Sequence, residues 1–236
     1  MRHRGFWLII TGTGRCGTRF MTRVLNSVGV KGTHEGLFQP TKTAVGPVVP
    51  PGLVTDEEIL ACIKQRRDNA WWGWQAEVSW MAAPYLETVR DLTVVHLVRD
   101  PKKTIDSMVR TGGFRPDIGA LWWEFQVKFL PELAEIDAPN PGTGQMDTDG
   151  RVARAGRFYV RWNQMIEPHA DIFWRVEDPV TDLLDLLEID YTGKEVFNDT
   201  ACGTAPGYGP VDIDLDRVPE PTRTELRDMA RKYGYG

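Results

Sequence analysis

The chain has 236 residues, 42% of them hydrophobic, and includes nine Trp and nine Phe, which is enough apolar material for a sizeable core and excludes a disordered chain. The 28 basic and 33 acidic residues leave a net charge of −5. This balance excludes a general electrostatic attraction to nucleic acid or to an anionic membrane, so an anionic ligand would have to be bound by a local group of residues.

Strand and helix patterns alternate along the chain, which predicts an α/β fold with a mainly parallel central sheet flanked by helices. The predicted strands cover residues 6–11, 28–34, 74–79, 92–98 and 170–176. The predicted helices cover residues 18–27, 56–70, 84–90, 102–110, 120–135, 151–168, 180–187 and 221–233. Segments 39–52 and 137–150 are rich in Pro and Gly and are predicted to be loops, and we expect one domain over residues 1–236.

The amino terminus and the cysteines bear on the compartment. Residues 1–10, MRHRGFWLII, imitate a signal peptide, but the apolar run is short and no small-residue cleavage site follows it. No segment approaches the roughly 20 apolar residues that span a bilayer. Cys16, Cys62 and Cys202 are widely spaced, which suits reduced thiols better than disulfides or a metal site. We therefore expect a soluble, cytoplasmic protein without a membrane span or a nucleic-acid partner.

The segment LIITGTGRCGTRFMTRVL, residues 8–25, joins an apolar strand to a helix through a glycine-rich turn. Gly12 and Gly17 have the separation of the phosphate loop G-x-x-x-x-G-K-[ST], yet Thr18 and Arg19 follow in place of the lysine and the magnesium-binding hydroxyl. The only cation within the turn is Arg15. Backbone amides and the helix start could still bind an anion, while a tight turn with a surface arginine is the structural alternative.

A second segment, VVHLVRDPKKTIDSMV, ends a strand at Arg99-Asp100-Pro101 and carries Ser107 two turns into the next helix. Pro101 suits the first helical turn. An arginine at the carboxyl end of a parallel strand lies where open α/β sheets bind ligands, and Arg99 and Ser107 could share one phosphate. Alternatively, Arg99 and Asp100 form a structural ion pair that caps the helix.

Together the two segments resemble the sulfotransferases that use 3′-phosphoadenosine 5′-phosphosulfate (PAPS). In that family a [KR]-[ST]-G-T loop binds the 5′-phosphosulfate, and an R-[DN]-P-(x)5-S segment binds the 3′-phosphate. This chain has Arg15-Cys16-Gly17-Thr18 and Arg99-Asp100-Pro101 with Ser107. Cys16 departs from the family's small hydroxyl residue. Weaker similarity at residues 173–189 and 226–236 extends the resemblance over nearly the whole chain.

The resemblance implies a phosphate-loop fold of the sulfotransferase type and transfer of a sulfonate from PAPS to a hydroxyl or amine, without a metal. The product would be 3′,5′-adenosine diphosphate (PAP), and the acceptor a small molecule, a lipid or a carbohydrate. Arg15 would neutralise charge on the leaving phosphate, with Thr18 as a donor; Arg19 would either help or face solvent. The implied donor-binding residues are Gly12, Gly14, Arg15, Cys16, Gly17, Thr18, Arg19, Arg99 and Ser107.

The segment GTHEG, residues 32–36, is the candidate for the base that accepts the proton of the acceptor. Similar family members carry a His or Glu there, and we favour Glu35 over His34. Either residue could instead merely hold the loop. Glu77 and Ser79, at the end of a predicted strand, could orient the acceptor, whereas His96 inside an apolar strand is expected to be a core residue.

Two other functions share the glycine-rich loop. A nucleoside or metabolite kinase would require a lysine after Gly17, where this chain has Thr18. A catalytically silent nucleotide-binding protein of the same fold would bind the donor without transferring its sulfonate.

Overall fold

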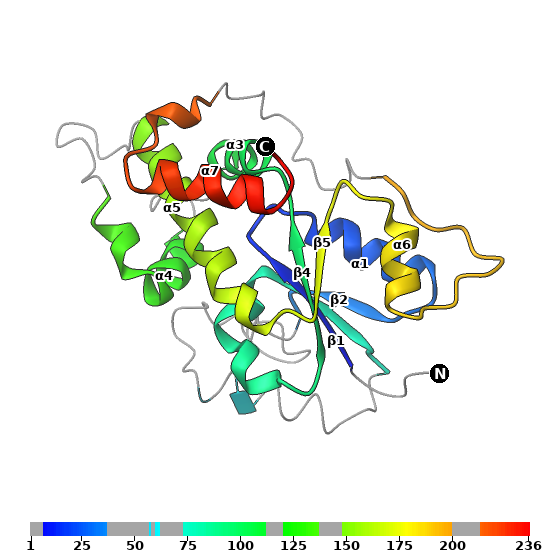
Figure 1. Ribbon diagram of the computed structural model, residues 1–236. Helices are drawn as coiled ribbons and strands as arrows, with labels where there is room; N and C mark the ends of the chain where they lie inside the picture. The colour runs from blue at the N-terminus through cyan, green and yellow to red at the C-terminus, as the bar shows by residue number, and fades with distance from the viewer. Residues whose placement is uncertain are drawn as a thin grey trace. The chain divides into compact units, whose positions relative to one another are not determined.

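A computed structural model of the protein describes residues 7–36, 57, 60, 61, 73–111, 120–136, 148–199 and 213–236 (Figure 1). In these ranges the strands are β1 Leu8–Gly12, β2 Gly32–His34, β3 Ala76–Val78, β4 Thr93–Val98 and β5 Ile172–Arg175. The α-helices are α1 Thr18–Ser27, α3 Pro101–Arg110, α4 Ala120–Phe129, α5 Thr148–Ile166, α6 Val180–Leu186 and α7 Thr222–Lys232. The 3₁₀-helices are η3 Trp80–Val89, η4 Pro131–Ala134, η5 Glu167–His169 and η6 Leu215–Arg217.

The five described strands form one sheet in the order β2-β3-β1-β4-β5, and every neighbouring pair is parallel. This confirms the α/β prediction with a parallel sheet flanked by helices. The strand predicted from residue 28 begins only at Gly32, because the preceding residues end α1. The amide of Val28 donates to the carbonyl of Val24, and the amide of Val30 donates to the carbonyl of Leu25.

The chain divides into two compact units. The first lies within Met1–Val98 and Ile166–Thr204 and contains the sheet, α1, η3 and α6. The second lies within Arg99–Met165 and Ala205–Gly236 and contains α3, α4, most of α5, and α7. The single domain expected from the sequence stays a prediction.

In the first unit, α1 and α6 cover one face of the sheet (Figure 1). The predicted apolar side of α1, formed by Phe20, Met21, Val24 and Leu25, is buried there. It packs with alternate strand residues, among them Leu8, Ile10, Ala76, Val78, Val95 and Leu97. Since in-register neighbours in a parallel sheet face the same side, these contacts define the α1 face of the sheet.

The helix predictions differ from the structure chiefly at prolines. The predicted helix 120–135 is divided, because α4 ends at Phe129 and the 3₁₀-helix η4 begins at Pro131, which has no amide to donate to the preceding turn. The predicted helix 84–90 overlaps η3, a 3₁₀-helix that contains Pro84 and ends at Val89. Helix α5 begins at Thr148, inside the predicted loop 137–150.

Some predicted features lie outside the described residues. These are the loop 39–52, most of the helix 56–70, Cys62 and Cys202.

In the second unit, α5 and α7 pack closely. A Cβ at Gly156 of α5 would lie 3.1 Å from Leu226 of α7. Arg161 of α5 donates to the carboxylate of Glu225 at 3.0 Å. Arg154, which is buried, donates to the carbonyl of Ile136 at 2.7 Å, and its guanidinium lies 4.4 Å from the ring centroid of Trp123. These contacts join α5 to α7 and to residues of the segment that contains α4 and η4.

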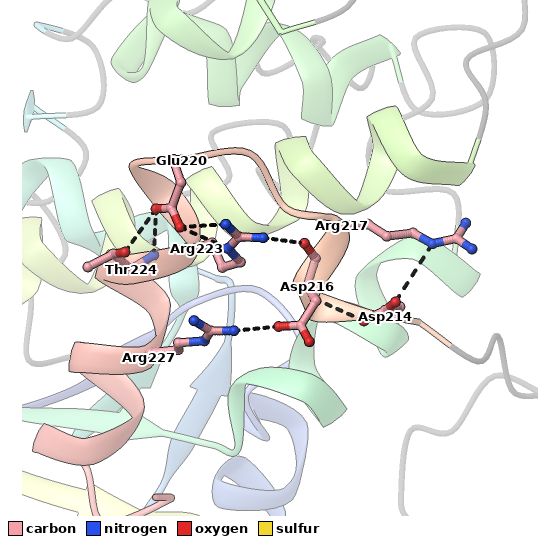
Figure 2. Close-up of polar contacts among 7 residues, drawn as sticks. All are labelled: Asp214, Asp216, Arg217, Glu220, Arg223, Thr224 and Arg227. Atoms are coloured by element: carbon pink, nitrogen blue, oxygen red, sulfur yellow. Dashed lines mark hydrogen bonds and ion pairs between the residues drawn. The ribbon is translucent and has the colours of Figure 1, made fainter.

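Figure 2 shows how charged residues connect α7 to the segment before it. Glu220 accepts hydrogen bonds from the hydroxyl of Thr224 at 2.9 Å and from the guanidinium of Arg223 at 2.8 Å. The bond from Thr224 has the larger effect and the bond from Arg223 the next, and both lower the pKa of the Glu220 carboxyl. Arg223 also donates to the carbonyl of Asp216, whose carboxylate accepts from Arg227. The cluster therefore orders the amino-terminal end of α7.

No helix within the described ranges is both long enough and apolar enough to cross a membrane.

Candidate functional site

The carboxyl ends of β1 and β4 lie side by side, with Gly12 in register with Leu97. The chain leaves β1 toward β2 at one edge of the sheet, whereas the connection after β4 leads to β5 at the other edge. In open α/β sheets ligands bind at such a switch point, outside the carboxyl ends of the strands. The two sequence motifs follow these two strands, because residues 13–17 come directly after β1 and Arg99 comes directly after β4.

The turn between β1 and α1 leads into a helix start whose first amides are not used by the helix itself. Gly17 has a φ of +106° and precedes Thr18, the first residue of α1. The first helical hydrogen bond runs from the amide of Met21 to the carbonyl of Gly17, so the amides of residues 18–20 have no acceptor within the helix. The N-cap residue of α1 is Gly17, which has no side chain that could accept from these amides. These amides and the helix dipole can bind a phosphate.

Gly12 is required by a close approach between the two strands. A Cβ built at Gly12 would lie 2.1 Å from the carbonyl oxygen of Leu97 and 2.7 Å from the sulfur of Cys16. Gly14 is different, because its Cβ would meet only the ring of Trp80 at 3.9 Å, an ordinary contact. A close backbone approach therefore requires glycine at position 12 but not at position 14.

Gly12→Ala is expected to lower the free energy of unfolding by about 3 kcal/mol, because the strand backbones must separate to admit the methyl group. The measurement is the urea midpoint of unfolding. Gly14→Ala is the matched control and should change stability by less than about 0.5 kcal/mol. Equal losses in the two variants would contradict the close-approach argument.

The side chains of the loop face in different directions. Cys16 is fully buried in the core of the first unit with Phe20 and Leu97, so this position can serve an anion only through its backbone. Arg15 is partly exposed, and Arg19 is exposed on the first turn of α1. The exposure of Arg19 favours the solvent-facing alternative considered for it.

His34 lies against the start of α1. Its register partner is Val78, which faces α1, so the imidazole is on the same side of the sheet as Thr18. The Nε2 atom of His34 lies 3.1 Å from the hydroxyl oxygen of Thr18 and 3.7 Å from Oε1 of Glu35. The structure thus places His34 against the start of α1 and Glu35 beside His34.

Glu35 reaches His34 because of its backbone conformation. Consecutive residues of a strand point to opposite faces, so an extended Glu35 would point away from His34. Glu35 instead has a φ of +55°, and its amide donates to the carbonyl of Val78 at 3.1 Å. Among the described non-glycine residues with positive φ are Arg15, Glu35 and Glu188, and the first two belong to the candidate site. Strained backbone of this kind is common at functional sites.

Glu77 and Ser79 make contacts that join β3 to its neighbours β2 and β1. Glu77 is fully buried, and its carboxylate accepts a hydrogen bond from the hydroxyl of Thr33, its register partner on β2. Ser79 accepts from the amide of Met81 and so caps η3, while its own amide donates to the carbonyl of Ile10. Thr33 was missed by the sequence reasoning, because no local pattern marks a cross-strand partner.

The second motif begins α3 in the second unit. The carboxylate of Asp100 accepts from the amide of Lys103 at 2.9 Å, and Pro101 occupies the first turn. Asp100 is therefore a helix cap, and its ion pair with Arg99 stays a prediction. The backbone carbonyl of Arg99 accepts from the hydroxyl of Tyr159 at 2.8 Å, and Ser107 is buried on α3. Tyr159, on α5, carried no sequence signal for this role.

His96 is buried and makes an edge-on contact with the ring of Phe173, in agreement with the core position expected for it. Within the described ranges no group of three or more His, Cys, Asp or Glu residues could hold a metal ion.

Comparisons of the chain with protein-family models and with curated proteins found no match. The likeness to PAPS-dependent sulfotransferases therefore depends on the two sequence motifs and on what the geometry of their residues can do.

Proposed function

We propose that the protein is a PAPS-dependent sulfotransferase that transfers a sulfonate to a hydroxyl or amine of a small molecule, lipid or carbohydrate. The observation that carries the proposal is the turn between β1 and α1. It combines a helix start whose N-cap residue is Gly17 with Arg15 in the turn and Thr18 where a kinase would have lysine. A cytoplasmic location belongs to the same proposal.

The residues present suit the two anionic groups of the donor. The amides after Gly17, the Thr18 hydroxyl and Arg15 would bind the 5′-phosphosulfate. Arg99 and Ser107 would bind the 3′-phosphate, while Asp100 is engaged at the start of α3. Bound PAPS would supply the sulfonate and the leaving phosphate.

Glu35 is the proposed base. It would accept the proton of the acceptor hydroxyl as the acceptor oxygen bonds to sulfur. The bond between sulfur and the bridging oxygen of the 5′-phosphate breaks, and its electron pair leaves with PAP. Arg15 and the loop amides would stabilise the charge that develops on that phosphate.

PAP is expected to stabilise the protein against thermal unfolding by mass action, by about 2.7 kcal/mol at a hundredfold excess over its dissociation constant. ATP with magnesium should stabilise the protein less. The measurement is a thermal shift with each nucleotide at matched concentration. Strong stabilisation by ATP with magnesium and none by PAP would favour the kinase and refute the sulfotransferase.

Arg99→Ala is expected to weaken PAP binding by about 10- to 100-fold, because a charge-assisted contact to the 3′-phosphate is lost. Calorimetric titration measures this, and Lys102→Ala, an exposed cation at the start of the same helix, is the control. Unchanged PAP affinity with lower stability would make Arg99 a structural residue.

Turnover separates the enzyme from a silent nucleotide-binding protein. Incubation with PAPS and representatives of each acceptor class, followed by mass spectrometry, should show release of PAP together with a sulfonated acceptor. Tight PAP binding without any transfer would favour the silent protein.

A further inference from the structure

Three groups from two elements meet beside the phosphate loop. Thr18 opens α1, while His34 ends β2 and Glu35 follows it. One atom, Nε2 of His34, lies 3.1 Å from the Thr18 hydroxyl and 3.7 Å from the Glu35 carboxylate. The first distance is a hydrogen bond, whereas the second is an ion-pair separation that is too long for one. The imidazole therefore connects the loop hydroxyl to the carboxylate.

The Thr18 hydroxyl is held at the helix start. Thr18 is 6% exposed, and its backbone carbonyl accepts from the hydroxyl of Thr22 at 3.0 Å. A threonine hydroxyl has one proton to donate and two lone pairs. If Nε2–H of His34 donates to it, the hydroxyl proton is left for another acceptor. At the amino terminus of α1, where the N-cap residue is Gly17, that acceptor would be the bound anion.

The neighbouring carboxylate favours this direction of donation. An anionic Glu35 close to Nε2 stabilises the form of His34 that carries a proton on that nitrogen. The His34 and Glu35 side chains are only 23% and 14% exposed, so water screens their interaction weakly. The left-handed backbone of Glu35 places the carboxylate on this side of the sheet.

We infer that His34 is a positioning residue that acts on the bound anion through the Thr18 hydroxyl. Its Nε2–H donates to Thr18, and Thr18 donates its own proton to the phosphate of the donor. This inference rests on the proposed function and gives the two base candidates different roles. His34 orients the Thr18 hydroxyl toward the phosphate of the donor, and Glu35 alone receives the proton of the acceptor.

A double-mutant cycle on anion binding tests the inference without an acceptor. Affinities for PAP and for inorganic pyrophosphate are measured by calorimetry on the full chain for Thr18→Val, His34→Leu and the double variant. Each single change is expected to weaken binding about tenfold, which is the usual loss for one hydrogen bond to a charged group. The double variant should bind no more weakly than Thr18→Val, because His34 acts through Thr18.

Conservative variants separate a hydrogen-bond role from a packing role. His34→Gln keeps a donor at a similar reach, and Thr18→Ser keeps the hydroxyl, so each should recover most of the affinity lost in His34→Leu or Thr18→Val. Thr181→Val makes the same change on α6, away from Thr18 and His34, and should bind like the unmodified chain. Additive losses in the cycle, or no recovery in His34→Gln, would overturn the inference.

A spectroscopic readout on the unmodified protein covers the case in which a variant fails to fold. In ¹⁵N NMR of the pyrophosphate complex, Nε2 of His34 is expected to carry a proton, and a bare Nε2 would overturn the inference. Pyrophosphate binding with the expected cycle but no PAP binding would refute the proposed donor and leave the role of His34 intact. PAP binding with additive losses in the cycle would support the proposed donor and refute the role of His34. Absence of binding to either anion would refute both the donor and the role of His34.

Discussion

Glu35→Gln is expected to reduce the rate of sulfonate transfer by about 10²- to 10⁴-fold, the usual contribution of a general base. The amide is nearly isosteric with the carboxylate but cannot take the proton of the acceptor. Because Glu35 is not among the residues proposed to bind PAP, the PAP affinity should change little. Single-turnover sulfonation with PAPS already bound measures the effect on the chemical step.

Glu188→Gln is the matched control for this change. Glu188 is also a glutamate with positive φ, at +52°, but it is exposed just after α6. His34→Asn should slow transfer less than Glu35→Gln. Full-speed transfer by Glu35→Gln beside an inactive His34→Asn would give the role of base to the histidine. Full activity in both variants would place the base elsewhere.

Arg15→Gly is expected to have opposite effects on transfer and on stability. Removal of the guanidinium should slow transfer by about 10²- to 10³-fold, the range for one group that stabilises developing charge. The free energy of unfolding should rise by about 1 kcal/mol, because a φ of +70° strains arginine but suits glycine. Single-turnover rates and urea midpoints of the same preparation measure the two quantities.

Glu188→Gly controls the stability half of this prediction. It relieves the same kind of backbone strain outside the candidate site and should stabilise the protein without slowing transfer. Arg15→Lys keeps the charge and the strain, so it should lose less activity than Arg15→Gly and show no gain in stability. A loss of stability in Arg15→Gly would mean that the arginine holds the loop together rather than serving an anion.

Periodicity predicted the elements well where one face alone is buried. Helix α1 has the predicted bounds, because its apolar residues recur at helical spacing and Gly17 marks its start. Prediction was poorer where an α-helix gives way to a 3₁₀-helix while the pattern of hydrophobic residues continues. The predicted helix 120–135 is interrupted before Pro131, and η3 is a 3₁₀-helix that carries buried residues on most of its surface.

The sequence by itself determined the phosphate-loop candidate, the second motif and the short list of base residues. These depend on residue type and spacing within one segment, which local backbone preferences control. Only the tertiary structure decided that Cys16 faces the core, that Gly12 stands against Leu97, and that His34 contacts Thr18. The strand order places β3 between β2 and β1 and fixes the side that each residue faces. Contacts between residues far apart in sequence depend on strand pairing and register, and no single segment encodes either of them.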